Sequence, residues 1–244
     1  MFQELPTVDS IGANKFFISY TGVSNSGKYR SGWDSLTIIK GPWHTPGAQI
    51  ISQYNYTITN SNGKKMTLVG FDTITNVNGD NLFYLINGTN GCTSLTTTHV
   101  GTATVTFDDG SVRTWHHSRQ KVRTYSTPGS FGGVITATIT GTKNVLTYTG
   151  IEAWGTNRNG ELFYGQIPAA SPLIYGYTVG SSTSCTHFWP YSGVYIHQNI
   201  LSGLKVTFGV GSNGAILNPI EPCPYGVKLD WTYLSASKEV IVAY

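Results

Sequence analysis

The chain of 244 residues carries 15 Lys and Arg against 12 Asp and Glu, which is a formal net charge of +3. This small balance argues against nucleic acid, whose partners carry a strongly basic patch, and the 39% hydrophobic content excludes a disordered chain. Only 11% of the residues are charged, against roughly 25% in an ordinary soluble domain. We expect the polar but uncharged surface that is typical of exported β-proteins.

No apolar run approaches the roughly 20 residues that cross a bilayer. The start of the chain has no basic region followed by an apolar stretch. We therefore expect no transmembrane segment, and an exported protein, extracellular or at the outer cell surface, whose signal sequence has been removed. Residues 1–14 are expected to form a flexible N-terminal segment.

Short runs rich in Val, Ile, Thr, Tyr and Phe recur along the chain between Gly, Asn, Ser or Pro clusters, and helical periodicity is nearly absent. This pattern predicts an all-β fold of the antiparallel β-sandwich type, either one domain or two packed sandwiches over residues 15–127 and 134–244. The predicted strands are 16–20, 36–39, 50–58, 65–69, 71–77, 82–86, 105–107, 112–115, 134–140, 145–149, 162–164, 174–179, 194–197, 204–210, 227–232 and 239–244. We expect 134–140 to pair with 145–149 as a hairpin, and 227–232 to pair with 239–244 as the final hairpin of the chain.

The segment 101–125 predicts a long hairpin. Asp109-Gly110 favours a two-residue turn with Phe107 opposite Val112. Alternation then separates an apolar face from a second face of cations and aromatics. This cationic face is a candidate contact for an anionic surface, such as acidic polysaccharide or lipid headgroups. The favoured alternative is that Lys and Arg stems cover a tryptophan on a solvated sheet face. The cationic face comprises Arg113, Trp115, His117, Arg119, Lys121 and Arg123.

Aromatic, amide and guanidinium groups at predicted turns form a second candidate site. Aromatics there can stack on sugar rings while the polar groups bond hydroxyls. The favoured alternative is that the rings fold back over the ends of the sandwich. The candidate ligand-binding residues are Trp43, His44, Trp154, Asn157, Arg158, Trp189 and Tyr191.

The cysteine count is three, which is odd. We predict a disulfide between Cys185 and Cys223 with Cys92 free; three unpaired thiols are the alternative. The chain has no CxxC motif and no Cys/His ligand spacing, so we expect neither a metal nor a cofactor.

Catalytic motifs are equally scarce. Adjacent His116 and His117 on a strand point to opposite faces and cannot hold one metal ion together. If the protein were a glycoside hydrolase, Glu152 and Glu161 would be the first carboxylate pair to consider. No catalytic residue is assigned, and we do not expect an enzyme.

Motifs in both halves of the chain carry a resemblance. They are Gly27-Lys28-Tyr29-Arg30-Ser31-Gly32, Thr45-Pro46-Gly47-Ala48, Thr73-Ile74-Thr75-Asn76, Val105-Thr106-Phe107-Asp108-Asp109-Gly110 with Arg113-Thr114-Trp115, and Gly155-Thr156-Asn157-Arg158-Asn159-Gly160. With a late cysteine before the final hairpin, they resemble an uncharacterised family of secreted, lipoprotein-like surface proteins of Bacteroidetes. The resemblance implies an exported all-β surface protein and no particular activity. The chain departs from that pattern near its start, where it has no lipidation cysteine.

The leading hypothesis from the sequence is a structural or adhesive protein of the cell surface, such as a fibre or filament subunit. Its partners would be other surface proteins or copies of itself. A carbohydrate-binding module that uses the loop aromatics to bind polysaccharide is the alternative, and a glycoside hydrolase is third.

Overall fold

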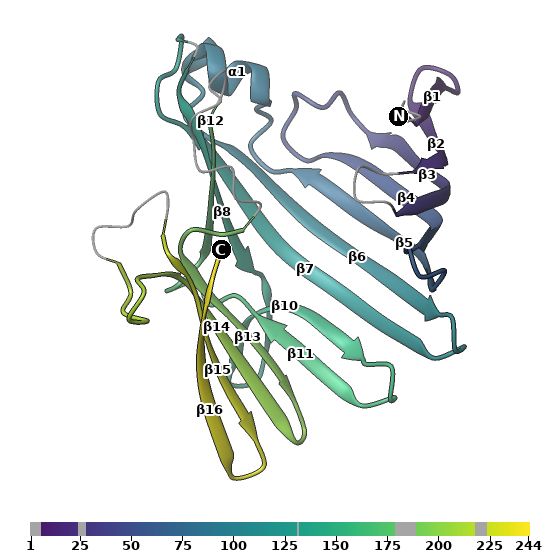
Figure 1. Ribbon diagram of the computed structural model, residues 1–244. Helices are drawn as coiled ribbons and strands as arrows, with labels where there is room; N and C mark the ends of the chain where they lie inside the picture. Colours follow the sequence, from purple (N-terminus) through teal and green to yellow (C-terminus); the bar gives the residue numbers. More distant parts are fainter. Residues whose placement is uncertain (1–5, 24–27, 131, 179–188, 218–223) are drawn as a thin grey trace.

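A computed structural model describes residues 6–23, 28–130, 132–178, 189–217 and 224–244. The fold is all-β and antiparallel, as predicted, and sixteen strands form one hydrogen-bonded sheet (Figure 1). The strands of the first half are β1 (Thr7–Ser10), β2 (Lys15–Val23), β3 (Tyr29–Lys40), β4 (Ala48–Thr59), β5 (Lys65–Asn76), β6 (Leu95–Phe107) and β7 (Val112–Tyr125). Those of the second half are β8 (Val134–Gly141), β9 (Lys143–Val145), β10 (Tyr148–Thr156), β11 (Leu162–Gln166), β12 (Leu173–Thr178), β13 (Gly193–Asn199), β14 (Ser202–Val210), β15 (Gly226–Tyr233) and β16 (Ala236–Ala243).

Strand β7 joins the two halves of the sheet. The main path runs β1-β2-β3-β4-β5-β6-β7-β10-β11-β13-β14-β15-β16, with β1 and β16 as its two ends. The first part of β7 pairs with β10, from Thr114 opposite Thr156 to His117 opposite Ala153. Its last part, from Arg119 onward, pairs with β8 instead. One long strand therefore serves two partners, and the strands share a single open sheet rather than two separate stacked sheets.

The ladders from β7 to β8 and β10 also link the regions on either side of residues 126–133. The division into domains 15–127 and 134–244 stays a prediction. Within the segment expected to be flexible, residues 7–10 form edge strand β1, whose four residues are all exposed and pair with β2.

The predicted strand at residues 82–86 is wrong, because Leu82–Asn87 form the short helix α1. The side chain of Asn81 caps its start by accepting a hydrogen bond from the backbone N–H of Tyr84. Gly88 ends it in the left-handed conformation, with φ of 65°. A short 3-10 helix, η1 (Thr89–Gly91), follows.

Helix α1 covers a small apolar cluster at one end of the sheet. Leu85 is completely buried there, together with Cys92, Leu95, Tyr125 and Ile135. Cys92 is a free thiol, as predicted, and burial raises its pKa, with Asp80 adding to the effect. The predicted Cys185–Cys223 disulfide lies outside the described residues.

A second local prediction also fails. Residues 134–140 and 145–149 were expected to pair as a hairpin, but β8 pairs with β7 and β12. Strand β9 and the start of β10 form the nearby hairpin. The hydrogen-bonded pairing of β8 with β7 and β12 therefore prevails over the local turn after it. By contrast, the predicted final hairpin is confirmed, because β15 pairs with β16 along its whole length.

Candidate functional site: a polar groove on the concave face

The register of the β6–β7 hairpin decides which side chains share the groove. Thr106 lies opposite Val112 and Val105 opposite Arg113, so the predicted pairing of Phe107 with Val112 is wrong by one residue. The loop has three residues, because the N–H of Phe107 bonds to the carbonyl of Ser111. Gly110 takes the left-handed conformation this loop requires, with φ of 79°.

This one-residue shift turns the cationic face over relative to β6. Arg113 and Trp115 now lie opposite the buried Val105 and Ala103 instead of facing away from them. The apolar and cationic side chains, predicted on separate faces, are therefore mixed on one face.

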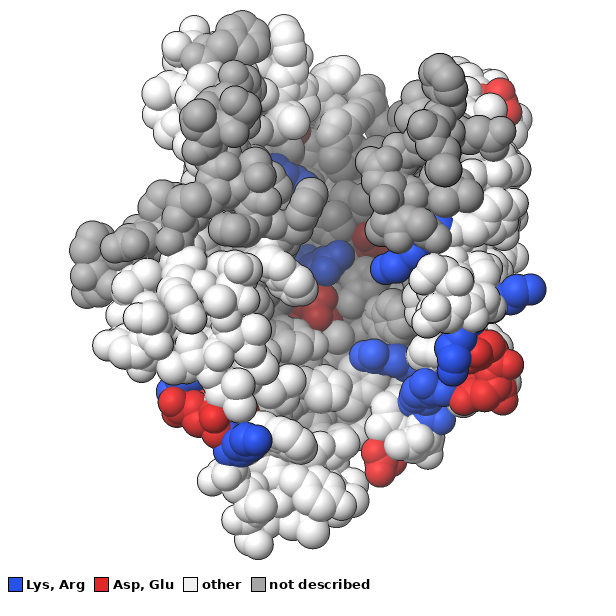
Figure 2. All heavy atoms as spheres, in the orientation of Figure 1, with Lys and Arg blue, Asp and Glu red and all other residues white. Residues whose placement is uncertain are grey.

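That face lines a cavity of about 530 Å3, which we call the central groove. Four of the six predicted residues of the cationic face take part: Arg113, Trp115, His117 and Arg119. The sheet must curl to form it, because β4 and β13 both line the groove although they are far apart in strand order. The other lining residues are Ser52, Tyr54, Tyr56, Leu68, Asp72, Glu152, Ala153 and Tyr195. Figure 2 shows this hollow, with cationic and acidic side chains inside it.

Two glycines lie on the strands next to those of His117 and Tyr195, and they let these two rings lie close to the sheet. A Cβ atom at Gly101 would lie 2.6 Å from Cε1 of His117, and one at Gly165 would lie 2.3 Å from the hydroxyl of Tyr195. Any side chain at these two positions would displace a ring that lines the groove. The glycines thus give the groove part of its depth.

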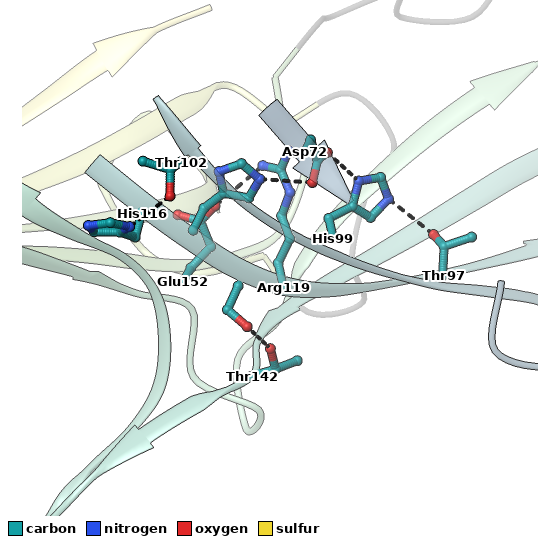
Figure 3. Close-up of polar contacts among 10 residues, drawn as sticks. Asp72, Thr97, His99, Thr102, His116, Arg119, Thr142 and Glu152 are labelled. Carbon is teal, nitrogen blue, oxygen red and sulfur yellow. Dashed lines mark hydrogen bonds and ion pairs between the residues drawn. The ribbon is translucent and has the colours of Figure 1, made fainter. Parts of the chain in front are cut away.

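Asp72 of β5 lies between two histidines (Figure 3). Its Oδ2 is 3.0 Å from Nδ1 of His99, and its Oδ1 is 3.1 Å from Nε2 of His117. Burial by itself would raise the pKa of Asp72, but the hydrogen bonds from His117 and His99 outweigh it and lower that pKa well below its usual range. Asp72 is therefore ionised and engaged on both oxygens.

The second carboxylate of the groove also has a cationic partner, through one of its oxygens. Glu152 of β10 is only 8% exposed, and its Oε1 accepts a hydrogen bond from Nη1 of Arg119 at 3.3 Å (Figure 3). Tyr195 of β13 faces the same space; burial, with Glu152 adding to the effect, raises its pKa to about 12. Its hydroxyl therefore stays protonated at neutral pH and can donate a hydrogen bond.

Arg113 differs from these groups. It forms no ion pair with any residue that the structure describes, and its buried Nε has no hydrogen-bond partner. Its guanidinium carbon lies 4.8 Å from the centre of the Phe163 ring and 5.4 Å from that of Trp115. Burial lowers the pKa of nearby His197, and the Arg113 charge lowers it further. Arg113 is thus a positive charge in the groove that none of the described residues neutralises with an ion pair.

Lys121 and Arg123 continue the cationic face beyond the groove. Both are partly buried. Burial, with the like charges of Arg123 and Arg119 adding to the effect, lowers the pKa of Lys121 to about 8.

The candidate loop aromatics do not line the central groove as far as the chain is described. Trp154 lies on strand β10 rather than in a turn. Its ring is stacked on that of His116, with 5.5 Å between the ring centres, and Nζ of Lys143 lies 3.6 Å from the centre of the Trp154 ring. Trp43 and His44 lie in the loop after β3. Trp189 is 60% exposed and Tyr191 is half-buried, both just before β13. Ligand binding by these residues stays a prediction.

Asn157 and Arg158 both have structural contacts in the turn between β10 and β11. Oδ1 of Asn157 accepts hydrogen bonds from the backbone N–H groups of Asn159 and Glu161. Arg158 forms an ion pair with Asp109, which ties this turn to the β6–β7 loop. Glu161 accepts a hydrogen bond from Asn157 and does not line the groove with Glu152.

The sequence interpretation missed Asp72, Tyr54, Tyr56 and Tyr195 as groove residues. The alternation of Tyr54 and Tyr56 with polar residues on one strand was the only local signal available. Nothing local connects them to Tyr195, because they lie on β4 and it lies on β13.

The described part of the chain contains no cluster of three or more His, Cys, Asp or Glu side chains suited to a metal ion. None of its helices is long and apolar enough to cross a membrane. Comparison with known protein families, curated proteins and solved structures finds no match to this chain. Fold and site define an all-β protein with one open, curled antiparallel sheet. Its concave face carries a polar groove with an arginine that has no ion-pair partner among the described residues.

Proposed function

We propose that this chain is an exported cell-surface protein that binds an acidic saccharide in the central groove. Arg113 carries the proposal, because a carboxylate or sulfate on the ligand would supply the anion that its guanidinium does not find among the described residues. The neighbouring groups suit a sugar: Trp115 offers a ring, Tyr195 a hydroxyl donor, and the engaged carboxylates further acceptors for hydroxyl groups. Adhesion, the leading hypothesis from the sequence, then proceeds through a glycan rather than through protein alone.

The test is a glycan array that contrasts uronate-bearing and sulfated glycans with neutral ones. Wild type should bind the acidic glycans, and Arg113→Gln should weaken that binding about 10- to 100-fold, since a hydrogen bond to a charged group contributes about 1.5–3 kcal/mol. Arg113→Lys should keep part of the affinity. Added salt should weaken binding.

Lys205→Gln is the matched control, because Lys205 is exposed on β14 and does not line the groove. Circular dichroism checks that each variant is folded. Equal binding of neutral glycans, or full binding by Arg113→Gln, would refute the proposal. Binding lost only in Trp43→Ala or Trp189→Ala would favour the loop aromatics instead.

A second candidate is a filament subunit that assembles through its sheet edges. The sheet ends at β1 and β16, and β16 exposes Val240 and Val242 at 40% and 43%. An unpaired edge strand can accept a strand from a neighbouring copy. Negative-stain electron microscopy at high concentration should then show filaments that vanish when residues 1–12 are deleted or when Val242→Lys charges the edge. Single particles in every sample would exclude this candidate.

A further inference from the structure

A second cavity, of about 620 Å3, lies at the tips of three hairpins; we call it the tip hollow. It is lined by parts of the β4–β5 turn, the β6–β7 loop and the β10–β11 turn. Its lining is partly apolar and partly charged, and the residues used below are Ile58, Lys64, Lys65, Met66, Phe107, Asp108, Asp109 and Arg158. Figure 2 shows cationic and acidic side chains gathered at the lower right edge of the hollowed face.

The tip hollow and the central groove lie on the same face and along the same strands. Ile58 pairs with Met66, and Met66 with Phe107. Two residues further along β5, Leu68 already lines the central groove, and Asp72 lines its far part. Side chains two residues apart on a strand share a face. From Met66 to Asp72 this face extends for about 20 Å at about 3.4 Å per residue.

The tip hollow carries charges that the described residues only partly neutralise. Arg158 pairs with Asp109, and Nζ of Lys64 is 4.0 Å from Asp108 with both side chains exposed. Lys65 has no ion-pair partner among residues 6–23, 28–130, 132–178, 189–217 and 224–244. An anion can therefore bind here as well as at Arg113.

Both cavities also contain carboxylates: Asp72 and Glu152 in the groove, Asp108 and Asp109 at the tips. A nucleic acid strand carries a phosphate on every nucleotide, so these carboxylates would repel it along its whole length. A saccharide chain offers hydroxyl donors to the carboxylates and spaced acidic groups to the cations, so the mixed lining favours it.

We propose that the central groove and the tip hollow are two subsites for one linear acidic polysaccharide that lies along the strands. This inference rests on the proposed function and adds that the ligand is a polymer. Binding at one subsite raises the effective concentration of the same chain at the other, so affinity should grow with chain length.

The experiment is isothermal titration calorimetry with oligogalacturonates, oligomannuronates and heparin-derived oligosaccharides, each from the dimer upward. Wild type should bind long oligomers at least about 10-fold more tightly than dimers, with a plateau once both subsites are spanned. Lys64→Gln combined with Lys65→Gln should reduce this ratio several-fold. Arg113→Gln should weaken short and long oligomers alike, and Lys205→Gln should change neither.

The outcomes separate the two proposals. Binding that depends on Arg113 but not on chain length or on the tip lysines would overturn the polymer inference and leave the proposed function standing. No binding of any acidic oligosaccharide would overturn both. Tighter binding of oligothymidylate, weakened by the same variants, would replace the saccharide with a single-stranded nucleic acid.

Discussion

At the scale of single residues, Asp72 connects the stability of the protein to its groove. It is 16% exposed and accepts hydrogen bonds from histidines on two further strands, β6 and β7. The carboxylate thereby fixes both rings, of which His117 lines the groove. Losing it would leave buried ring N–H groups without their acceptor.

We expect Asp72→Asn to lower the free energy of unfolding by about 1–3 kcal/mol at pH 7. The folded protein lowers the pKa of this carboxyl, whereas in the unfolded chain it titrates near about 3.9. The contribution is therefore complete above about pH 4 and is lost progressively as the pH falls further. Urea unfolding of both proteins between pH 7 and pH 2 should show their difference shrinking below about pH 4.

Asp9→Asn is the control, because Asp9 is exposed on edge strand β1. It should change the stability by less than about 0.5 kcal/mol. A difference between wild type and Asp72→Asn that stays constant down to pH 2 would contradict the assigned hydrogen bonds.

At the scale of elements, the β6–β7 hairpin determines what the groove contains. Its three-residue loop, and not the two-residue turn, places Arg113 on the same face as Val105. Gly110 makes this loop possible because its φ of 79° is unfavourable for most side chains. A Cβ atom there would meet no neighbour within 4 Å, so any effect of substitution comes from the backbone.

Gly110→Ala should therefore destabilise the protein by about 1 kcal/mol. Gly110→Asn should cost clearly less, because asparagine tolerates the left-handed conformation. Thermal unfolding of the two variants beside wild type measures both effects. Equal stability of Gly110→Ala and wild type would exclude this loop geometry.

At the scale of the whole molecule, β7 links all strands in one hydrogen-bonded sheet. Its pairs with β8 and β10 are long-range contacts that neither half can make alone. Arg158 adds a second link between the halves by pairing with Asp109 across two turns. These connections predict that the sheet unfolds as one unit.

Hydrogen exchange in increasing urea tests this prediction. Amides of β4 in the first half and β14 in the second half should converge on one opening free energy. Two distinct values would show that the halves 15–127 and 134–244 open independently. Full-length protein is used, so the result does not depend on whether either half folds by itself.

Local signals predicted much of the fold. Strands near 16–20, 50–58 and 204–210 follow from β-prone runs between Gly, Asn and Ser turns, and the structure confirms them as parts of β2, β4 and β14. Helix α1 was missed because six residues such as Leu82–Asn87 suit a short strand equally well. Its Asn81 and Gly88 caps were the signal that could have revealed it.

The sequence by itself determined the class of the protein, because strand propensity and turn chemistry act over a few residues. It also determined that the cationic side chains share a face, since alternation depends only on the strand itself. Only the tertiary structure decided that this face is the inside of a curl. It alone brings Arg113 and Tyr195 into one groove and Asp72 into hydrogen-bond distance of His117. The residues that line the groove lie on β4, β5, β7, β10 and β13. The positions of these strands depend on register and curvature over the whole sheet, which no local window of sequence contains.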